Sequence, residues 1–308
     1  MSTTKSLVVG NARQNFWLFN NRHGFDLTHP GSPSASPVKP RLTLQSKYNA
    51  PITIAPSKTA LVIIDMQNFF LSTAMGRSKG EGHAAEETLL KHGIPAARKA
   101  GIRVMHVTWG ISEEDLQTLP PSVWRIFGWN ICDDGMHKVE DDEDIAQGKI
   151  QRKEKKGDGG IGTDIGNVTL GDGTSQAAGK VLMKDQWNTG LHGGLVKSFE
   201  EGQKAQLPDV RFSKTRPSGF WDVSSSLHRF LKKEGITTLL FTGVNTDQCV
   251  LASIQDACNQ GFDTVMLKDG CGTTSPEFAT ETCVYNCQKS WGFISSCDEL
   301  EQGVEEMQ

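Results

Sequence analysis

The chain has 308 residues, long enough for one large hydrophobic core, and its 37% hydrophobic and 22% charged residues are typical of a globular protein. The formal net charge of -4 gives no reason to bind a nucleic-acid backbone, so we expect a small-molecule substrate and no nucleic acid. No apolar stretch approaches the roughly 20 residues that cross a bilayer, and the N-terminus lacks the apolar run of a signal peptide. We therefore expect a cytoplasmic protein without a membrane partner.

Residues 1–55 hold an aromatic cluster around Trp17, followed by a stretch rich in proline and serine that cannot continue a helix or a central strand. We interpret this segment as an N-terminal arm that lies over the domain. The run TALVIID at 59–65 is typical of a parallel strand buried on both faces. A helix near 84–100 and a strand at 102–109 complete a strand, helix, strand unit.

The segment from about 132 to 180 has a different composition, with an acidic run, a basic run and then a glycine-rich tract. We predict a surface insertion here, within a single domain that spans 1–308. Its Gly-x-Gly pieces do not lie between a strand and a helix, so they do not predict a phosphate-binding loop.

The second half of the chain repeats the alternation of helices and strands. We expect helices at 218–235 and 246–261, strands at 237–244 and 262–270, and a final helix that starts at Ser275 with Pro276 in its first turn. This order predicts an α/β fold with an open, mostly parallel sheet and helices on both faces. Ligands bind such sheets at the carboxyl ends of the strands, where Asp65 and Cys249 are expected to lie.

Seven cysteines without a C-x-x-C pair argue against a disulfide framework, and most should be small buried side chains. Cys283 and Cys287 would share a helix face and, with Cys271 or Cys297, offer thiolates to zinc. Their spacing favours core packing instead, and we predict no metal and no cofactor.

Cys249 differs from the other cysteines because it follows the strand at 237–244 and falls in the first turn of the next helix, where Thr246 or Asp247 can serve as the cap. The partial positive charge of a helix start favours a thiolate and lowers the pKa of the thiol. The same turn offers the backbone N–H groups of Asn245 and Cys249 to an oxyanion. Cys249 is therefore the candidate nucleophile.

Two charged residues are candidate partners for this thiol. Asp65 ends its strand beside much apolar sequence, where a carboxylate is costly without a function, and it can take the thiol proton and return it to a leaving amine. Lys214 lies between a short strand and a helix, and its charge can stabilise both the carboxylate and the thiolate. Taken singly, Asp65 is equally readable as a turn cap, and Lys214 as a solvated lysine.

Three segments in this order resemble the isochorismatase-like cysteine hydrolase family: LVIIDMQNFF with Asp65, FSKTRPSGF with Lys214, and GVNTDQCVLASIQDACNQGFDTVMLKDGCGTTSP with Cys249. The resemblance implies a three-layer αβα sandwich with a parallel sheet of about six strands. It implies an Asp65, Lys214 and Cys249 triad, a cis peptide between Val244 and Asn245, and a homo-oligomer, either dimer or tetramer. The Asp-x-His metal pattern of nicotinamidases in this family is not found at the corresponding place.

These features favour a hydrolase, specifically an amidohydrolase, that cleaves a C–N bond of a small amide, ureide or carbamoyl compound through a thioester. One alternative is hydrolysis of isochorismate or another vinyl ether. Another is an inactive binding or regulatory protein on the same fold. Candidate substrate contacts are Gln67, Trp187 and Trp221, and the two tryptophans, like Trp109, are equally readable as core. His106 is interpreted as a core histidine that is hydrogen-bonded and not a metal ligand.

Overall fold

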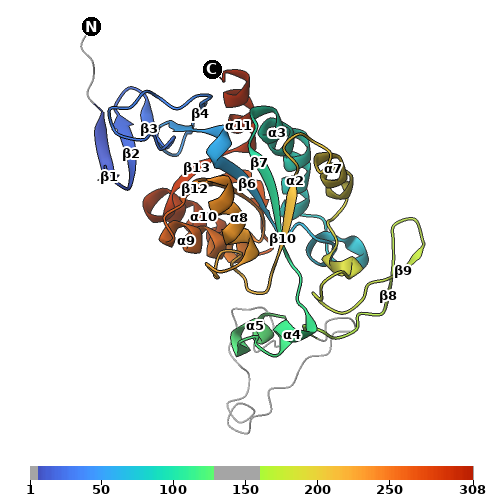
Figure 1. Ribbon diagram of the computed structural model, residues 1–308. Helices are drawn as coiled ribbons and strands as arrows, with labels where there is room; N and C mark the ends of the chain where they lie inside the picture. Colours follow the sequence, from blue (N-terminus) through green and yellow to red (C-terminus); the bar gives the residue numbers. More distant parts are fainter. Residues whose placement is uncertain (1–5, 128–159, 308) are drawn as a thin grey trace.

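A six-stranded sheet forms the centre of the molecule in the computed structural model, which describes residues 6–127 and 160–307 (Figure 1). Its strand order is β10-β7-β6-β11-β12-β13, and all neighbouring strands are parallel. The strands are β6 (Thr59–Ile64), β7 (Arg103–Trp109), β10 (Val210–Lys214), β11 (Thr238–Val244), β12 (Asp263–Gly272) and β13 (Phe293–Ser295). The predicted α/β class with about six mostly parallel strands is confirmed.

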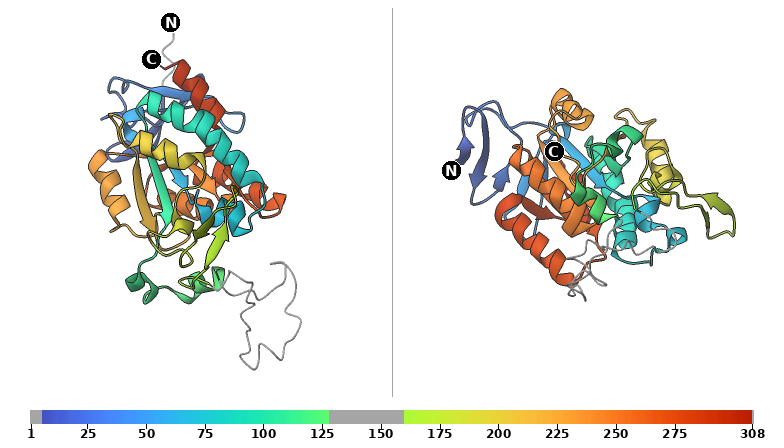
Figure 2. Two further views of the ribbon diagram at one scale, coloured as in Figure 1. Left: turned by 90° about the vertical axis from the view of Figure 1, so that its right-hand side faces the viewer. Right: turned by 90° about the horizontal axis from the view of Figure 1, so that it is seen from below.

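Helices cover both faces of this sheet and complete the three layers (Figure 2). One face packs against α8 (Ser226–Glu234), α9 (Leu251–Asn259) and α10 (Glu277–Asn286). The other packs against α2 (Glu81–Thr88), α3 (Ile94–Ala100), α7 (Gly194–Gly202) and α11 (Cys297–Glu305). In β6, Ala60, Val62 and Ile64 belong to the first core, whereas Leu61 and Ile63 belong to the second. A central strand therefore needs an unbroken apolar run.

Short elements link these layers. The short α-helices are α1 (Asn68–Leu71), α4 (Glu113–Leu116) and α5 (Pro121–Ile126), and the 3-10 turns are η1 (Pro56–Lys58), η2 (Thr73–Met75) and η4 (Trp187–Thr189). Wider π-helical turns are η3 (Leu89–Gly93), η5 (Thr246–Val250) and η6 (Cys287–Trp291). Within the described residues, no helix combines the length and the apolar character that a bilayer span requires.

Two predicted helices differ in extent from those observed. Within the range 218–235, where one helix is expected, only α8 is helical. It begins after Ser225, which caps its start by accepting a hydrogen bond from the His228 N–H. The helix expected from Ser275 is α10, which begins at Glu277 after Pro276 in the N-cap position. It is not the final helix, since β13 and α11 follow it.

The N-terminal segment is a sheet of its own and not a simple arm. Its strands are β1 (Leu7–Asn11), β2 (Asn15–Asn20), β3 (Gly24–Asp26), β4 (Leu42–Leu44) and β5 (Ile52–Ile54), in the order β1-β2-β3-β5-β4. It is fastened to the main sheet at Asp263, the first residue of β12. The buried Asp263 carboxylate accepts hydrogen bonds from Trp17 Nε1 at 2.6 Å, His29 Nε2 at 2.6 Å and Thr238 Oγ1 at 3.0 Å.

Most of the segment predicted as an insertion, residues 132–159, lies outside the described residues. Its described remainder includes the two-stranded sheet of β8 (Asn167–Thr169) and β9 (Ser175–Ala177). In Figure 1, this hairpin projects beside the end of the sheet that faces α4 and α5. It contributes no strand to the six-stranded sheet.

Candidate active site

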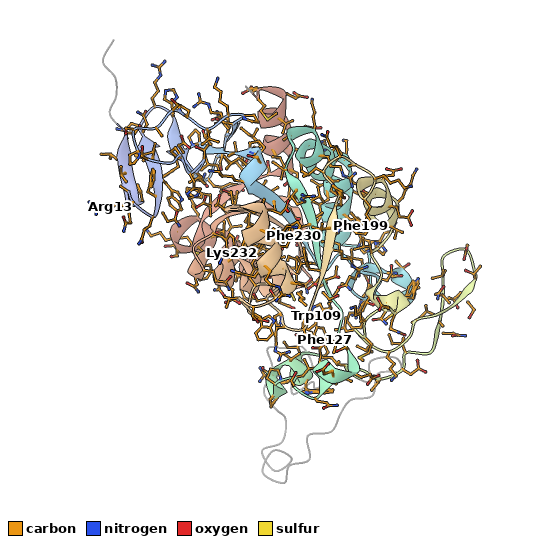
Figure 3. The ribbon with its side chains drawn as sticks, viewed as in Figure 1. Arg13, Trp109, Phe127, Phe199, Phe230 and Lys232 are labelled. Carbon is orange, nitrogen blue, oxygen red and sulfur yellow. The ribbon has the colours of Figure 1, made fainter. Side chains whose placement is uncertain are left out.

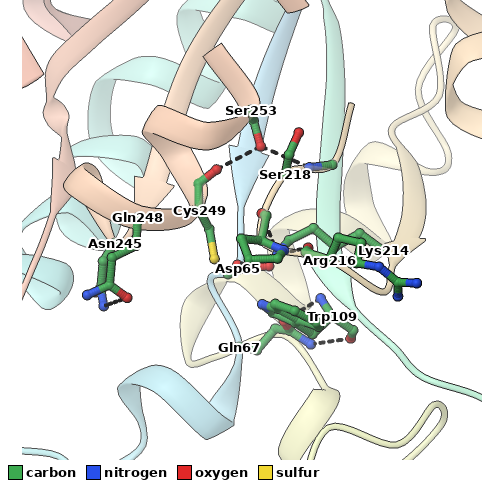
Figure 4. Close-up of polar contacts among 12 residues, drawn as sticks. Asp65, Gln67, Trp109, Lys214, Arg216, Ser218, Asn245, Gln248, Cys249 and Ser253 are labelled. Atoms are coloured by element: carbon green, nitrogen blue, oxygen red, sulfur yellow. Dashed lines mark hydrogen bonds and ion pairs between the residues drawn. The ribbon is translucent and has the colours of Figure 1, made fainter. Parts of the chain in front are cut away.

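The three residues predicted as a triad lie together at the carboxyl ends of three strands (Figure 4). Asp65 directly follows β6, Lys214 is the last residue of β10, and Cys249 lies in η5 after β11. Their side chains are almost inaccessible, with residue exposures of 0%, 3% and 7% respectively. The parallel topology alone explains their meeting, because it brings segments about 150 residues apart to one edge of the sheet.

Lys214 is surrounded by polar and aromatic partners. Its Nζ lies 2.9 Å from Asp65 Oδ2 and donates hydrogen bonds to the carbonyls of Arg216 at 3.1 Å and Pro217 at 3.0 Å. The same ammonium sits 3.9 Å from the centroid of the Trp109 ring. A charge buried this deeply needs such partners, and here a carboxylate, two carbonyls and an aromatic face provide them.

Burial controls the protonation of the other two groups. It raises the pKa of Asp65, and the nearby Lys214 ammonium opposes that increase. It raises the pKa of Cys249 to about 12, an effect that Lys214 opposes and Asp65 reinforces. The expectation of a lowered thiol pKa is therefore wrong, because desolvation outweighs the helix start. At neutral pH the Cys249 thiol is therefore protonated at rest, beside the pair formed by Asp65 and Lys214.

The turn that carries Cys249 begins with the peptide bond between Val244 and Asn245, which is cis as the family resemblance implies. Asn245, and not Thr246 or Asp247, is the N-cap, and its carbonyl accepts from the N–H groups of Gln248 at 3.0 Å and Val250 at 3.2 Å. The Asp247 carboxylate instead accepts from the hydroxyls of Thr273 at 2.6 Å and Ser275 at 2.8 Å. These bonds fasten the turn that carries Cys249 to the loop after β12.

Ser253 is a supporting residue that the sequence interpretation missed. Its hydroxyl donates to the Cys249 carbonyl at 2.7 Å and accepts from the Gly219 N–H at 3.0 Å. It therefore joins the helix that follows Cys249 to the loop that follows Lys214. The available signal was its place four residues after Cys249, on the same face of a helix.

The three predicted substrate contacts differ from one another in burial and in their partners. Gln67 is fully buried, and its amide is used by the backbone: Nε2 donates to the carbonyls of Trp109 and Thr189, each at 2.8 Å, and Oε1 accepts from the Trp109 N–H at 2.9 Å. Trp187 is half-buried in η4. Trp221 is 48% exposed and lies under the Arg216 guanidinium, 4.8 Å from ring centroid to Cζ. Gln67 thus holds backbone in place and offers no free polar group.

An aromatic cluster encloses the site beside α4 and α5. Trp109 and Phe127 lie together at this end of the sheet (Figure 3), with ring centroids 5.0 Å apart and an interplanar angle of 83°. Phe69 packs against Phe127 at 6.0 Å. Beyond Trp109, at the edge strand β10, a cavity of about 630 Å³ is lined by polar residues that include Arg211 and Ser213. Trp109 also lines it, whereas Asp65 and Cys249 do not.

His106 is buried as predicted, but it is not hydrogen-bonded. Within the described ranges, neither ring nitrogen has a partner, and the ring packs edge-on against Phe199. Burial, with the charges of Arg211 and Arg98, lowers the pKa of His106 to about 3. Across residues 6–127 and 160–307, no group of three or more His, Cys, Asp or Glu side chains is arranged to hold a metal.

Comparison with known proteins agrees with this architecture. The family model for the isochorismatase domain matches residues 171–292, a range that includes Lys214 and Cys249. The crystal structure of a cysteine hydrolase from Pseudomonas syringae pv. phaseolicola aligns with a TM-score of 0.55 at 14% identity, covering 86% of this chain and 97% of that one. The nicotinamidase PncA of Bacillus subtilis aligns with a TM-score of 0.51 at 19% identity, covering 78% and 99%. The resemblance to the isochorismatase-like cysteine hydrolases is confirmed.

Among curated proteins, this chain is similar to the ureidoacrylate amidohydrolase RutB of Rhizobium rhizogenes. The two are 27% identical over 255 residues, which cover 81% of this chain and 85% of the relative. The alignment is therefore close to the full length of both proteins.

Proposed function

We propose that this chain is a cysteine-dependent hydrolase that cleaves a C–N bond of a small amide, ureide or carbamoyl compound. The observation that carries the proposal is the buried meeting of the Cys249 thiol with the ion pair between Asp65 and Lys214, whose charged atoms are 2.9 Å apart. The similarity to ureidoacrylate amidohydrolases, which act on a ureide by name, supports the choice of bond.

The reaction begins with the thiol proton. As Cys249 Sγ attacks the substrate carbonyl carbon, its proton passes to Asp65. The summed charge of the three side chains is therefore unchanged by the transfer. Lys214 remains charged and stabilises whichever partner is anionic. A lone thiolate at this site would be costly, as the raised pKa of the thiol shows, but a transfer within a neutralised cluster avoids that cost.

Attack produces a tetrahedral oxyanion, for which the N–H groups of Asn245 and Cys249 are the proposed donors. Asp65 then returns the proton to the departing nitrogen, the C–N bond breaks, and ammonia or an amine leaves, while the acyl or carbamoyl group stays on the sulfur. A water molecule, deprotonated by Asp65, attacks the thioester, and Asp65 then returns this proton to the departing sulfur, which releases the acid and the free thiol. Asp65 thus serves in turn as base, acid, base and acid.

A substrate panel tests the proposal. Purified protein is supplied with amides, ureido acids and isochorismate, and both ammonia and pyruvate are measured. We expect ammonia from amides or ureides, an acyl adduct on Cys249 by intact mass, and no turnover by Cys249→Ala. Pyruvate release from isochorismate alone would contradict C–N cleavage. Equal turnover by wild type and Cys249→Ala would overturn the role of the thiol.

We also propose that the chain works as a homo-oligomer in the cytoplasm, where thiols stay reduced. Light scattering after size-exclusion chromatography is expected to give a mass of two or four chains. A monomer at micromolar concentration would contradict the proposed assembly, and export of the native protein from cells would contradict the proposed location.

A further inference from the structure

We propose that Trp109 is a further catalytic residue, whose indole N–H donates a hydrogen bond to Cys249 Sγ when the sulfur becomes anionic. Trp109 ends β7 and is 1% exposed. Its Nε1, the only polar atom of the ring, has no hydrogen-bond partner of good geometry within the described part of the chain. Buried donors without partners are rare and costly, so such a group in an active site calls for an explanation.

The Cys249 side chain lies close to the Trp109 ring in Figure 4, and its sulfur is the acceptor that we assign to this N–H. The Trp109 side chain accordingly opposes the rise in the pKa of Cys249. A neutral thiol is a weak acceptor, whereas a thiolate is a strong one. The donor is therefore poorly satisfied in the resting site and becomes satisfied as negative charge develops on sulfur, which is the differential interaction that catalysis requires.

The indole is held rigidly in this position. The Trp109 backbone donates to Gln67 Oε1 at 2.9 Å, and its carbonyl accepts from Gln67 Nε2 at 2.8 Å. The ring is fixed between the Lys214 ammonium, 3.9 Å from its centroid, and the edge-on ring of Phe127. A donor fixed in advance needs no reorganisation during the reaction.

Two charged side chains also face the Cys249 sulfur: the Lys214 ammonium, which favours a thiolate, and the Asp65 carboxylate, which disfavours it. The Trp109 N–H is a neutral donor that, like Lys214, favours the thiolate. The inference rests on the proposed function, since the contact has a catalytic meaning only if Cys249 is the nucleophile. Its test must therefore measure the thiol separately from turnover.

Replacing Trp109 with 3-benzothienylalanine exchanges the N–H for sulfur and keeps the shape of the ring. The readout is the rate of carboxamidomethylation of Cys249 by iodoacetamide, followed by peptide mass mapping because the chain has six other cysteines. Loss of one hydrogen bond to a charged group predicts an alkylation rate about tenfold lower at fixed, mildly alkaline pH. The same replacement at Trp291, in η6, is the matched control and is expected to leave the rate unchanged.

Trp109→Phe provides a second variant that retains an aromatic face without an N–H, and it is expected to show the same loss. Alkylation of both Trp109 variants within twofold of wild type would overturn the inference. A slower alkylation together with full turnover by Cys249→Ala would leave the contact standing and remove the proposed function. Loss of turnover in Cys249→Ala with unchanged alkylation in the Trp109 variants would remove the contact and leave the proposed function standing.

Discussion

The buried ion pair between Lys214 and Asp65 predicts a strong non-additivity in stability. Lys214→Met removes the ammonium and leaves Asp65, which is fully buried, without its neutralising charge. Breaking a buried pair from one side typically costs about 3–5 kcal/mol of unfolding free energy. Asp65→Asn should cost less, because Lys214 Nζ keeps its hydrogen bonds to the carbonyls of Arg216 and Pro217.

The double variant removes both charges together. Since neutral groups of similar size often replace a buried pair with little loss, we expect its stability to exceed that of Lys214→Met, with a coupling energy of about 2 kcal/mol or more. Urea unfolding at neutral pH, followed by fluorescence, measures the cycle. All three variants should lack turnover, so activity does not distinguish them. Additive losses from the two single changes would refute the reasoning, as would a loss below about 1 kcal/mol in Lys214→Met.

Acid provides an independent check on the same variant. The pKa of Asp65 is raised in the folded protein, so the folded state binds this proton more tightly than the unfolded chain does. Between the two pKa values, stability from this group increases as pH falls. Without Lys214 the folded pKa rises further, and the deficit of Lys214→Met relative to wild type should narrow as pH falls. A constant deficit between neutral pH and about pH 5 would contradict this account.

Three other perturbations test separate features. His106 has a pKa of about 3 in the folded protein and 6.5 ordinarily, so below pH 6.5 protonation of His106 in the unfolded chain lowers the stability of the fold. His106→Leu should abolish this loss, which is roughly 2 kcal/mol at about pH 5. An unchanged pH profile of the Tm would contradict the neutral, buried ring. Gln67→Leu removes a hydrogen bond from each of three backbone groups, of which only the Thr189 carbonyl keeps a side-chain donor, Arg211 Nη2 at 2.6 Å. It should cost about 2–4 kcal/mol in urea unfolding, and a cost below about 1 kcal/mol would count against its structural role. Asp263→Asn weakens the hydrogen bonds from Trp17 and His29, so limited proteolysis should release the N-terminal segment faster than in wild type. The thiol of Cys249 should react at an unchanged rate. Equal proteolysis would show that these bonds do not anchor the sheet.

An element can be predicted from the sequence when neighbouring residues define it, and less well when residues far apart in the chain do. The runs at 59–65 and 237–244 identify β6 and β11 because a strand buried on both faces must be continuously apolar. The N-terminal sheet was not foreseen, since its strands are three to six residues long and depend on pairing with one another. Short strands have little periodicity of their own.

At the site, Asp65, Lys214 and Cys249 were identifiable from strand ends and family motifs, but their protonation was not. Proximity to a helix start is visible in a sequence, whereas the desolvation that raises the pKa of Cys249 depends on its place in a core built from residues far apart in the chain. The use of Gln67 by the backbone was hidden for the same reason, because its partners, Trp109 and Thr189, are far from it in the chain.

The bonds at Asp263 have a consequence for how the protein can be handled. They tie the N-terminal sheet to the starts of β11 and β12, at the opposite end of the strands from Cys249. A purification tag, fluorescent label or fusion partner attached on the N-terminal sheet would therefore be separated from the carboxyl ends of the strands, where Cys249 lies. The N-terminal sheet therefore offers a point of immobilisation for sensing turnover on a surface, at the end of the strands opposite Cys249.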